Sequence, residues 1–234
     1  MKKYSYILLL SLSIISCKES TRKEDGKLTV VTTTSMITDL VKNIGGDAIQ
    51  VQGLMGSGVD PHLYKASEGD VSKLINADAI FYNGLHLEGK LVEVFEQMQY
   101  QNIKTYAIAE VLDKNTLIDS DYFKSNYDPH IWFNIDYWIE AGGYVSKKLQ
   151  ELNPENATSF DTNWKSYLSK LQAVKNKIKA TISTLPKEKR VLVTAHDAFN
   201  YFGKSFGFEV VGLQGLSTAT EAGVQDVQRL SGFI

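Results

Sequence analysis

Short apolar runs alternate with helical apolar periods along the first half of the chain. A β-rich run at residues 28–33 precedes a helical period at residues 36–44, which the pair Gly45-Gly46 closes. Strands alternating with helices are typical of parallel βαβ units. The same alternation continues with expected strands at residues 51–55, 79–82 and 105–109, and with expected helices at residues 71–76 and 91–98.

A helix start is indicated just before the helix expected at residues 71–76. Ser67 is followed three residues later by Asp70, which predicts an N-cap of the capping-box kind, with Asp in place of the usual Glu or Gln.

One long helix is predicted in the middle of the chain. Residues 135–152 have a helical period, and after Pro154 apolar side chains recur at spacings of three and four until shortly before Pro186. We interpret the aromatic members of this stripe as packing residues rather than as a cofactor site. A helix of this length between two α/β regions would act as a rigid connector. The stripe consists of Phe160, Trp164, Tyr167, Leu168, Leu171, Val174, Ile178 and Ile182.

A second series of strands and helices follows the long helix. Expected strands at residues 191–194 and 209–213 alternate with expected helices at residues 198–206 and from 224 onward. Two strands alone do not make a stable sheet faced by helices, so we expect the second lobe to be incomplete in this chain.

The expected fold class is therefore α/β, with two Rossmann-like α/β lobes bridged by one long rigid helix. The expected domains are an N-terminal α/β lobe at residues 27–153, a connecting helix at 154–185 and a partial C-terminal α/β lobe at 186–234.

The first residues of the chain have the pattern of an export signal. Basic Lys2-Lys3 precedes the apolar residues 7–15, a run too short to span a membrane. The sequence Ile14-Ile15-Ser16-Cys17 resembles the lipobox of bacterial lipoproteins, which implies a lipoprotein signal peptide at residues 1–16, cleavage before Cys17 and acylation of that cysteine. Residues 17–26 would then be a lipidated tether. The alternative is an ordinary signal peptide with an incidental thiol.

Cysteine usage and charge narrow the classes of function. Cys17 is the only cysteine, so no intrachain disulfide can form, and its acylation would explain an odd thiol in an exported protein. The net charge is −2, and removal of Lys2 and Lys3 takes it to −4. With no basic run or stripe in the sequence, we expect no nucleic-acid partner.

Histidine is rare in this chain, and two of the four histidines lie in one repeated tripeptide. Asp-Pro-His occurs at residues 60–62 and again at 128–130, although the chain has only four histidines and four prolines. Proline fixes its own φ and favours extended geometry in the residue before it, so His62 and His130 each leave a stiff segment. His196 follows an expected strand, at the sheet edge where open α/β folds bind ligands. Imidazole is the commonest side-chain ligand for zinc and related ions, so these three histidines are candidate metal ligands.

The spacing of these histidines does not by itself show whether they bind a metal. Ligands from three distant segments match no short-range zinc motif, so surface or hydrogen-bonded roles stay open. Asp60, Asp128 and Asp197 are candidate acceptors for the ring N–H groups of bound histidines. His86 lacks the Asp-Pro context, and we interpret it as structural.

These motifs resemble those of the solute-binding lipoproteins of bacterial zinc and manganese ABC importers, the periplasmic metal-binding proteins of cluster A-I. The resemblance implies two α/β lobes bridged by one long helix, with the metal buried between the lobes. The matching stretches run in order along nearly the whole mature chain and are Val59-Asp60-Pro61-His62, Phe81-Tyr82-Asn83-Gly84-Leu85-His86-Leu87-Glu88, Asp128-Pro129-His130-Ile131-Trp132, Thr194-Ala195-His196-Asp197-Ala198-Phe199-Asn200-Tyr201-Phe202 and Leu216-Ser217-Thr218 to Glu221-Ala222-Gly223.

The resemblance also implies a ligand set. The metal ligands fall on His62, His130 and His196, and the fourth is a carboxylate of the C-terminal lobe that we expect beyond Ile234. The third position is Glu in many manganese-specific members and His in zinc-binding ones, so His196 favours Zn²⁺, with Mn²⁺ as the alternative. Dedicated zinc carriers often have a histidine-rich loop before the second ligand, whereas residues 113–127 contain no histidine.

The function implied is capture of Zn²⁺ or Mn²⁺ outside the cytoplasmic membrane and delivery to an ABC permease with its ATPase. The protein would be a monomer in the bacterial cell envelope, lipid-anchored on the periplasmic or extracellular face. One alternative is a metal-binding surface adhesin or structural lipoprotein. Another is a zinc hydrolase with three histidine ligands, but the sequence has no recognisable general-base motif. We therefore expect no enzymatic activity.

Overall fold

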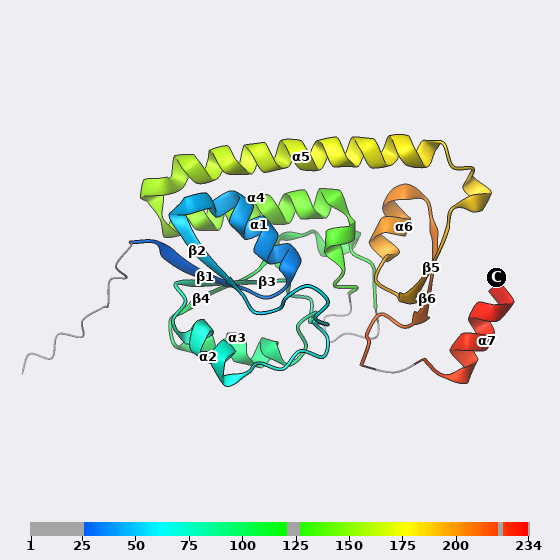
Figure 1. Ribbon diagram of the computed structural model, residues 1–234, viewed down its shortest axis with the longest axis horizontal. Helices are drawn as coiled ribbons and strands as arrows, with labels where there is room; N and C mark the ends of the chain where they lie inside the picture. Colours follow the sequence, from blue (N-terminus) through cyan, green and yellow to red (C-terminus); the bar gives the residue numbers. More distant parts are fainter. Residues whose placement is uncertain (1–25, 121–126, 220–221, 234) are drawn as a thin grey trace, which may run out of the picture.

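The first lobe is built on a parallel sheet of four strands in the order β2-β1-β3-β4 (Figure 1). The structure is a computed structural model, which describes residues 26–120, 127–219 and 222–233. In this sheet β1 lies between β2 and β3, with Val30 opposite Val51 and Val31 opposite Ile80. The prediction of parallel βαβ units is confirmed. The strands are β1 (Leu28–Thr32), β2 (Ile49–Gly53), β3 (Ala79–Tyr82) and β4 (Lys104–Ala107).

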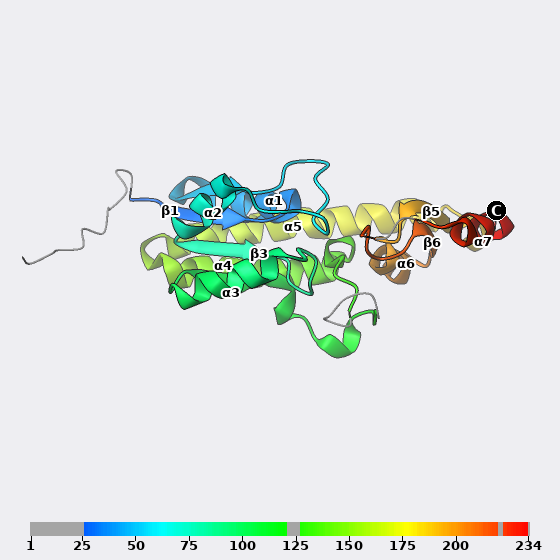
Figure 2. The same cartoon turned by 90° about the horizontal axis from the view of Figure 1, so that it is seen from below.

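Helices cover both faces of this sheet. The helices α1 (Ser35–Gly45) and α4 (Ile135–Leu152) lie on one face, and α2 (Glu68–Ile75) and α3 (Leu91–Tyr100) lie on the other (Figures 1 and 2). Neighbouring strand residues point to opposite faces. Val30 therefore joins the core that includes α1 and α4, whereas Val31 joins the separate core that includes α2 and α3. Burial on both faces explains why the central strands β1 and β3 contain adjacent apolar residues, whereas the edge strand β2 alternates apolar and polar residues.

The capping box predicted at Ser67 is present. The Ser67 hydroxyl accepts the N–H of Asp70 at 3.2 Å, and the Asp70 carboxylate accepts the N–H of Ser67 at 3.0 Å. The helix consequently begins at Glu68, three residues before the apolar period that predicted it. Other short differences at element ends are of the same kind, because caps and turns rather than apolar period decide where an element begins or ends.

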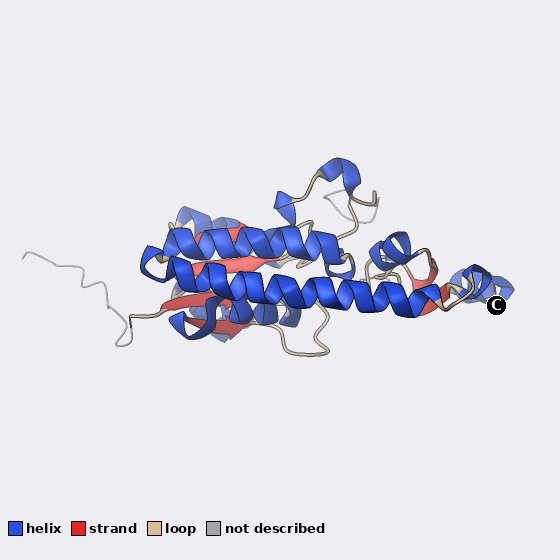
Figure 3. Cartoon of the chain, turned by 90° about the horizontal axis from the view of Figure 1, so that it is seen from above, coloured by secondary structure: helices blue, strands red, loops and turns tan. Residues whose placement is uncertain are grey.

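The long helix α5 (Ala157–Ser183) runs beside α4 and continues past it to the second lobe (Figure 3). Its 27 residues span about 40 Å at the usual helical rise. Hydrogen bonds attach it to the first lobe through Asn163, which donates to the carbonyl of Ile44 at 3.0 Å. At its far end, Arg190 donates to the carbonyl of Ile182 at 3.1 Å. Within the described residues, none of the helices combines the length and the apolar character needed to cross a membrane.

The second lobe contains a parallel pair of strands, β5 (Val191–His196) and β6 (Glu209–Gln214), with the helices α6 (Asn200–Phe206) and α7 (Val224–Phe233). The side chain of Tyr201 in α6 is fully buried and belongs to the core of the first lobe. The ring centroids of Phe133 and Phe199 lie 4.2 Å apart across the same junction. Packing at α6 therefore joins the two lobes.

Several short 3₁₀ turns complete the described part of the chain. The third of them, at residues 114–116, lies in the segment that precedes the second Asp-Pro-His motif. They are η1 (Gly46–Ala48), η2 (Ile108–Val111), η3 (Lys114–Thr116), η4 (Ile131–Phe133), η5 (Pro154–Asn156) and η6 (Lys187–Lys189).

Candidate metal site

The two Asp-Pro-His tripeptides adopt the same local geometry. In each of them one carboxylate oxygen of the aspartate accepts the main-chain N–H of the histidine two residues later, at 2.9 Å for Asp60 and His62 and at 2.9 Å for Asp128 and His130. This side-chain turn, together with the fixed φ of the proline, holds each histidine at the end of a stiff loop. The repeat seen in the sequence is thus a repeat in structure.

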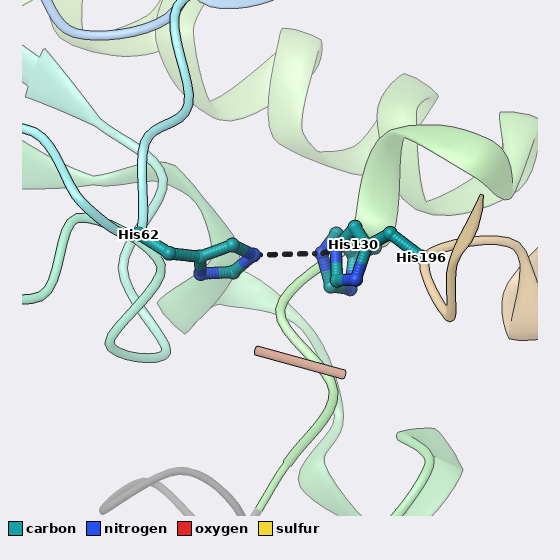
Figure 4. A group of neighbouring side chains, drawn as sticks. All are labelled: His62, His130 and His196. Atoms are coloured by element: carbon teal, nitrogen blue, oxygen red, sulfur yellow. Dashed lines mark hydrogen bonds between the residues drawn. The ribbon is translucent and has the colours of Figure 1, made fainter. Parts of the chain in front are cut away.

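The imidazoles of His62, His130 and His196 meet between the lobes. The Nε2 atom of His130 lies 3.2 Å from Nε2 of His62 and 3.2 Å from Nε2 of His196. Figure 4 shows the three rings directed towards one another, and one nitrogen from each ring lies within 4.8 Å of the others. His62 and His130 come from loops of the first lobe, whereas His196 is the last residue of β5 in the second.

Hydrogen bonds at the opposite ring nitrogens set the tautomers. The Nδ1 of His196 lies 2.8 Å from the carbonyl oxygen of Gly215, which can only accept, so this nitrogen carries the proton. The Nδ1 of His130 lies 2.6 Å from Oδ1 of Asp128, a carboxylate acceptor. Both neutral rings then present the lone pair of Nε2 to the space between them.

The spacing of these lone pairs suits a metal ion. Two nitrogens bound tetrahedrally to zinc at 2.0–2.1 Å are about 3.3–3.4 Å apart, close to the 3.2 Å separations seen here. The lone pairs on Nε2 of His130 and His196 repel one another at this distance, and a cation between them removes that repulsion. A nitrogen of the third ring, His62, lies 3.2 Å from Nε2 of His130, and the three ligand atoms lie within 4.8 Å of one another, so all three rings can converge on one ion.

Burial favours the neutral, metal-coordinating form of the His62 and His196 rings. Burial, followed by the nearby His130, lowers the pKa of His62 to about 4. Burial also lowers the pKa of His196, against the opposing effect of its bond to Gly215. Protons therefore compete less for these nitrogens at neutral pH than they would for a free imidazole.

The three aspartates singled out from the sequence have different roles. Asp128 accepts from the ring of His130, as expected. Asp60 instead accepts the main-chain N–H of His62, and the carboxylate of Asp197 lies beside Asn200. These partners differ from the ring N–H groups that the sequence suggested for Asp60 and Asp197. For His196 the acceptor is the main-chain carbonyl of Gly215, which no sequence motif can indicate.

A loop at residues 83–89 supports both ligands of the first lobe. The side-chain amide of Asn83 donates to the carbonyl of Pro129 at 2.9 Å, directly before His130. The main-chain carbonyl of Leu87 accepts from the ring of His62, which opposes the lowering of the pKa of that ring by burial. Gly89 has φ of 47°, and a Cβ added there would lie 3.1 Å from the carbonyl oxygen of His62, so this close approach requires glycine.

The buried Glu88 organises that loop. Its carboxylate accepts the hydroxyl of Thr33 at 2.8 Å and the N–H groups of Asn83 and Gly84 at 2.6 and 3.3 Å. Burial raises the pKa of Glu88 to about 7, although these hydrogen bonds oppose the rise. Residues 81–88 form one of the stretches that resemble the family, but no residue pattern in the sequence indicated that Glu88 holds this loop.

His86 lies outside the group of three histidines. It follows Leu85 in the same loop, and both have left-handed φ values, of 52° for Leu85 and 59° for His86. This conformation is uncommon for residues with a Cβ and reflects the tight path of the loop. A structural role for His86 stays a prediction.

Comparison with known proteins supplies the context for this geometry. The model of the ZnuA family, described as zinc-uptake complex component A, periplasmic, matches residues 30–234. The manganese-binding lipoprotein MntA of Bacillus subtilis is 44% identical over 226 residues, which are 96% of this chain and 73% of that protein. The metal ABC transporter substrate-binding lipoprotein ScbA of Streptococcus cristatus is 33% identical over 243 residues, covering 98% of this chain and 77% of that protein.

A solved structure agrees with the sequence relatives. The periplasmic zinc-binding protein TroA from Treponema pallidum superposes with a TM-score of 0.86 at 44% identity, over 89% of this chain and 74% of that chain. The fold class and the resemblance deduced from the motifs are thereby confirmed. The chain belongs to the ZnuA family, whose members are solute-binding proteins of metal ABC importers and not enzymes.

Proposed function

We propose that this protein captures Zn²⁺, with Mn²⁺ as the alternative cargo, through the imidazoles of His62, His130 and His196 and hands it to an ABC permease. The observation that carries the proposal is the convergence of three imidazoles from both lobes: Nε2 of His130 lies 3.2 Å from Nε2 of each of the other two rings, and one nitrogen from each ring lies within 4.8 Å of the others. Three neutral imidazoles fill three positions of a tetrahedral zinc site and leave one for a further ligand.

The preference for zinc rests on the donor atoms. Nitrogen donors suit zinc better than manganese, which favours carboxylate oxygen, and this site presents three imidazoles. Relatives of equal similarity carry both metals in their names: MntA of Bacillus subtilis is called manganese-binding and TroA of Treponema pallidum zinc-binding, each at 44% identity.

Capture would couple the two lobes. An ion held by His62 and His130 on one side and by His196 on the other fastens the lobes together, so loading changes how they pack. The helix α5 limits this motion, because it is continuous over 27 residues and is bound to both lobes. The permease would then distinguish the loaded from the unloaded arrangement.

The place of action follows in part from the family. Relatives named as lipoproteins of ABC transporters indicate an extracytoplasmic protein associated with the cell envelope. We propose in addition that Cys17 carries the lipid that anchors a monomeric chain. Cys17 lies outside the described residues, so its lipobox sequence alone supports this anchor.

Metal analysis tests the proposal. The protein is stripped of metal, dialysed against equal concentrations of Zn²⁺ and Mn²⁺ and assayed for bound metal per chain. We expect about one zinc ion per chain, in excess over manganese. Absence of any bound ion would overturn the site, and preferential binding of manganese would overturn the choice of cargo.

A further inference from the structure

A short segment after β6 touches ligand-bearing parts of both lobes. Its first residue, Gly215, accepts the Nδ1–H of His196 at 2.8 Å, as described above. Three residues later, the hydroxyl of Thr218 donates to Oδ2 of Asp60 in the first lobe at 2.5 Å. Leu216, between them, is only 7% exposed and fixes the segment in place.

The carboxylate of Asp60 connects Thr218 to the candidate metal ligand His62. Its Oδ2 accepts from Thr218, while its Oδ1 accepts the main-chain N–H of His62 at 2.9 Å. The Thr218 hydroxyl is thus separated from the main chain of His62 by a single carboxylate group. A hydrogen bond to a charged acceptor is among the stronger ones in proteins, particularly where it is partly shielded from water.

The second Asp-Pro-His motif is attached to the second lobe differently. The carbonyl of Asp128 accepts the hydroxyl of Tyr201 at 2.9 Å, and Oδ2 of Asp128 lies 3.3 Å from the side-chain amide of Asn200. Tyr201 is fully buried, so this attachment is backed by core packing.

On the His62 side, the described part of the second lobe contributes the Thr218 hydrogen bond to Asp60 and an edge contact between the rings of His62 and His196, whose centroids lie 5.4 Å apart, in place of a buried aromatic side chain like Tyr201. Asp60 and Thr218 are only partly buried, and Val59 and Leu63, which flank the first motif, are 42% and 53% exposed. The loop that carries His62 is therefore held to the second lobe by a polar contact, whereas the loop that carries His130 is held by buried aromatic packing. Loss of the polar contact would free the first loop without disturbing the second.

We propose that Thr218 is a positioning residue for the metal cargo, which acts through Asp60 to hold the His62 loop against the lobe that carries His196. This proposal rests on the three-histidine site of the proposed function. Without the hydroxyl, His62 samples more positions and the bound ion is released more easily. The coordinating atoms themselves stay the same, so the ion should leave faster while the number bound per chain is unchanged.

Two substitutions at one position separate the hydroxyl from the shape of the side chain. Thr218→Val keeps the shape and removes the donor, and Thr218→Ser keeps the donor. We expect Thr218→Val to weaken zinc binding about tenfold, the size expected for a hydrogen bond to a charged group, mainly through faster transfer to a chelator. Thr218→Ser should stay within about twofold of the unsubstituted protein. Thr181→Val, on the exposed side of α5, is the matched control.

A thermodynamic cycle with Asp60→Ala tests the route of the effect. If Thr218 acts through Asp60, Thr218→Val should have almost no further effect on the zinc Kd in the Asp60→Ala background. A tenfold effect in both backgrounds would overturn the proposed route. Equal Kd values and release rates for Thr218→Val and Thr181→Val would overturn the positioning role itself, while one ion bound by the unsubstituted protein would leave the three-histidine site intact. Thermal unfolding of each metal-free variant identifies any variant that has lost its fold. If Thr218→Val does not fold, Thr218→Ser tests the positioning role. Faster zinc release from Thr218→Ser than from the unsubstituted protein, despite the retained hydroxyl, would overturn that role.

Discussion

The Nε2 atoms of His130 and His196 lie 3.2 Å apart, although the two residues are separated by 66 positions and belong to different lobes. His130 is only 2% exposed, and its other ring nitrogen is bound to the buried carboxylate of Asp128. The ring of His130 therefore has a fixed position in the first lobe, against which the other two ligands are placed.

Removal of the central imidazole should abolish capture. We expect His130→Ala to lower zinc affinity by more than about a hundredfold, because even partners of ligands cost ten- to a hundredfold when replaced. Isothermal titration in competition with a chelator measures the loss, and growth under zinc limitation measures its consequence. His86→Ala is the control, since His86 lies outside the group. Unchanged binding and growth with His130→Ala would contradict the transport function proposed for this site.

The carboxylate behind His130 should also affect affinity. Asp128→Asn weakens the acceptor for the Nδ1–H of His130, a bond of 2.6 Å, and makes the ring a poorer donor to the metal. We expect zinc affinity to fall about ten- to a hundredfold. Asp47→Asn, in an exposed turn, provides the matched comparison in the same competition assay. Equal affinities for these two variants would show that Asp128 does not tune the ligand.

Glu88 should give the metal-free protein a distinctive pH dependence. Burial raises the pKa of Glu88 from 4.5 to about 7, so the folded state keeps a proton that the unfolded state loses between these values. The stability that this group contributes is fully present below pH 4.5 and is lost as the pH rises through 7, by about 3 kcal/mol in total.

Glu88→Gln removes this titration. Chemical denaturation of the metal-free protein and of the variant at several pH values gives the difference between their free energies of unfolding. Relative to Glu88→Gln, the unsubstituted protein should lose about 3 kcal/mol of its free energy of unfolding between pH 4.5 and pH 8. Parallel stability curves would contradict the raised pKa of Glu88.

Two adjacent glycines of α4 should respond in opposite ways to a methyl group. A Cβ at Gly142 would lie 2.4 Å from the ring of Trp164 in α5, whereas a Cβ at Gly143 would lie 3.8 Å from it. Gly142→Ala should therefore destabilise the fold by about 1–2 kcal/mol, because overpacking outweighs the gain in helix propensity.

Gly143→Ala serves as the matched variant. It should stabilise the protein by about 0.5–1 kcal/mol, since the helix gains alanine without a clash. Thermal unfolding should show melting temperatures displaced in opposite directions, by about 2–4 °C per kcal/mol for a chain of this size. A rise in both variants would mean that α4 and α5 are packed less closely than described.

The anchor can be tested independently of the metal site. Cys17→Ala removes the acceptor of the proposed lipid, so the mature chain should leave the membrane fraction and appear in the soluble fraction. Cell fractionation followed by immunoblotting measures the distribution, with Ser16→Ala as a control that keeps the cysteine. Retention of Cys17→Ala in the membrane fraction would contradict the lipobox interpretation.

Much of the fold was readable from local pattern. The central strands β1 and β3 contain adjacent apolar residues because both faces of the sheet are buried there, and the apolar stripe predicted α5 because its first part, from Phe160 to Leu171, packs into the core shared with α1 and α4. Where elements begin was less predictable. The strand expected at residues 51–55 is shifted to Ile49–Gly53, and β5 continues to His196, because strand pairing decides these ends.

The sequence by itself determined which residues could bind a metal: a repeated Asp-Pro-His and a third histidine at a strand end specify ligand chemistry and stiff loops within a few residues of chain. Only the tertiary structure decided how those ligands are held. The carbonyl of Gly215, the carboxylate of Glu88 and the hydroxyl of Thr218 act on segments far away in the chain. The reason is physical, because a main-chain carbonyl or a lone hydroxyl has no sequence signature, and its partner is chosen only when the lobes pack together.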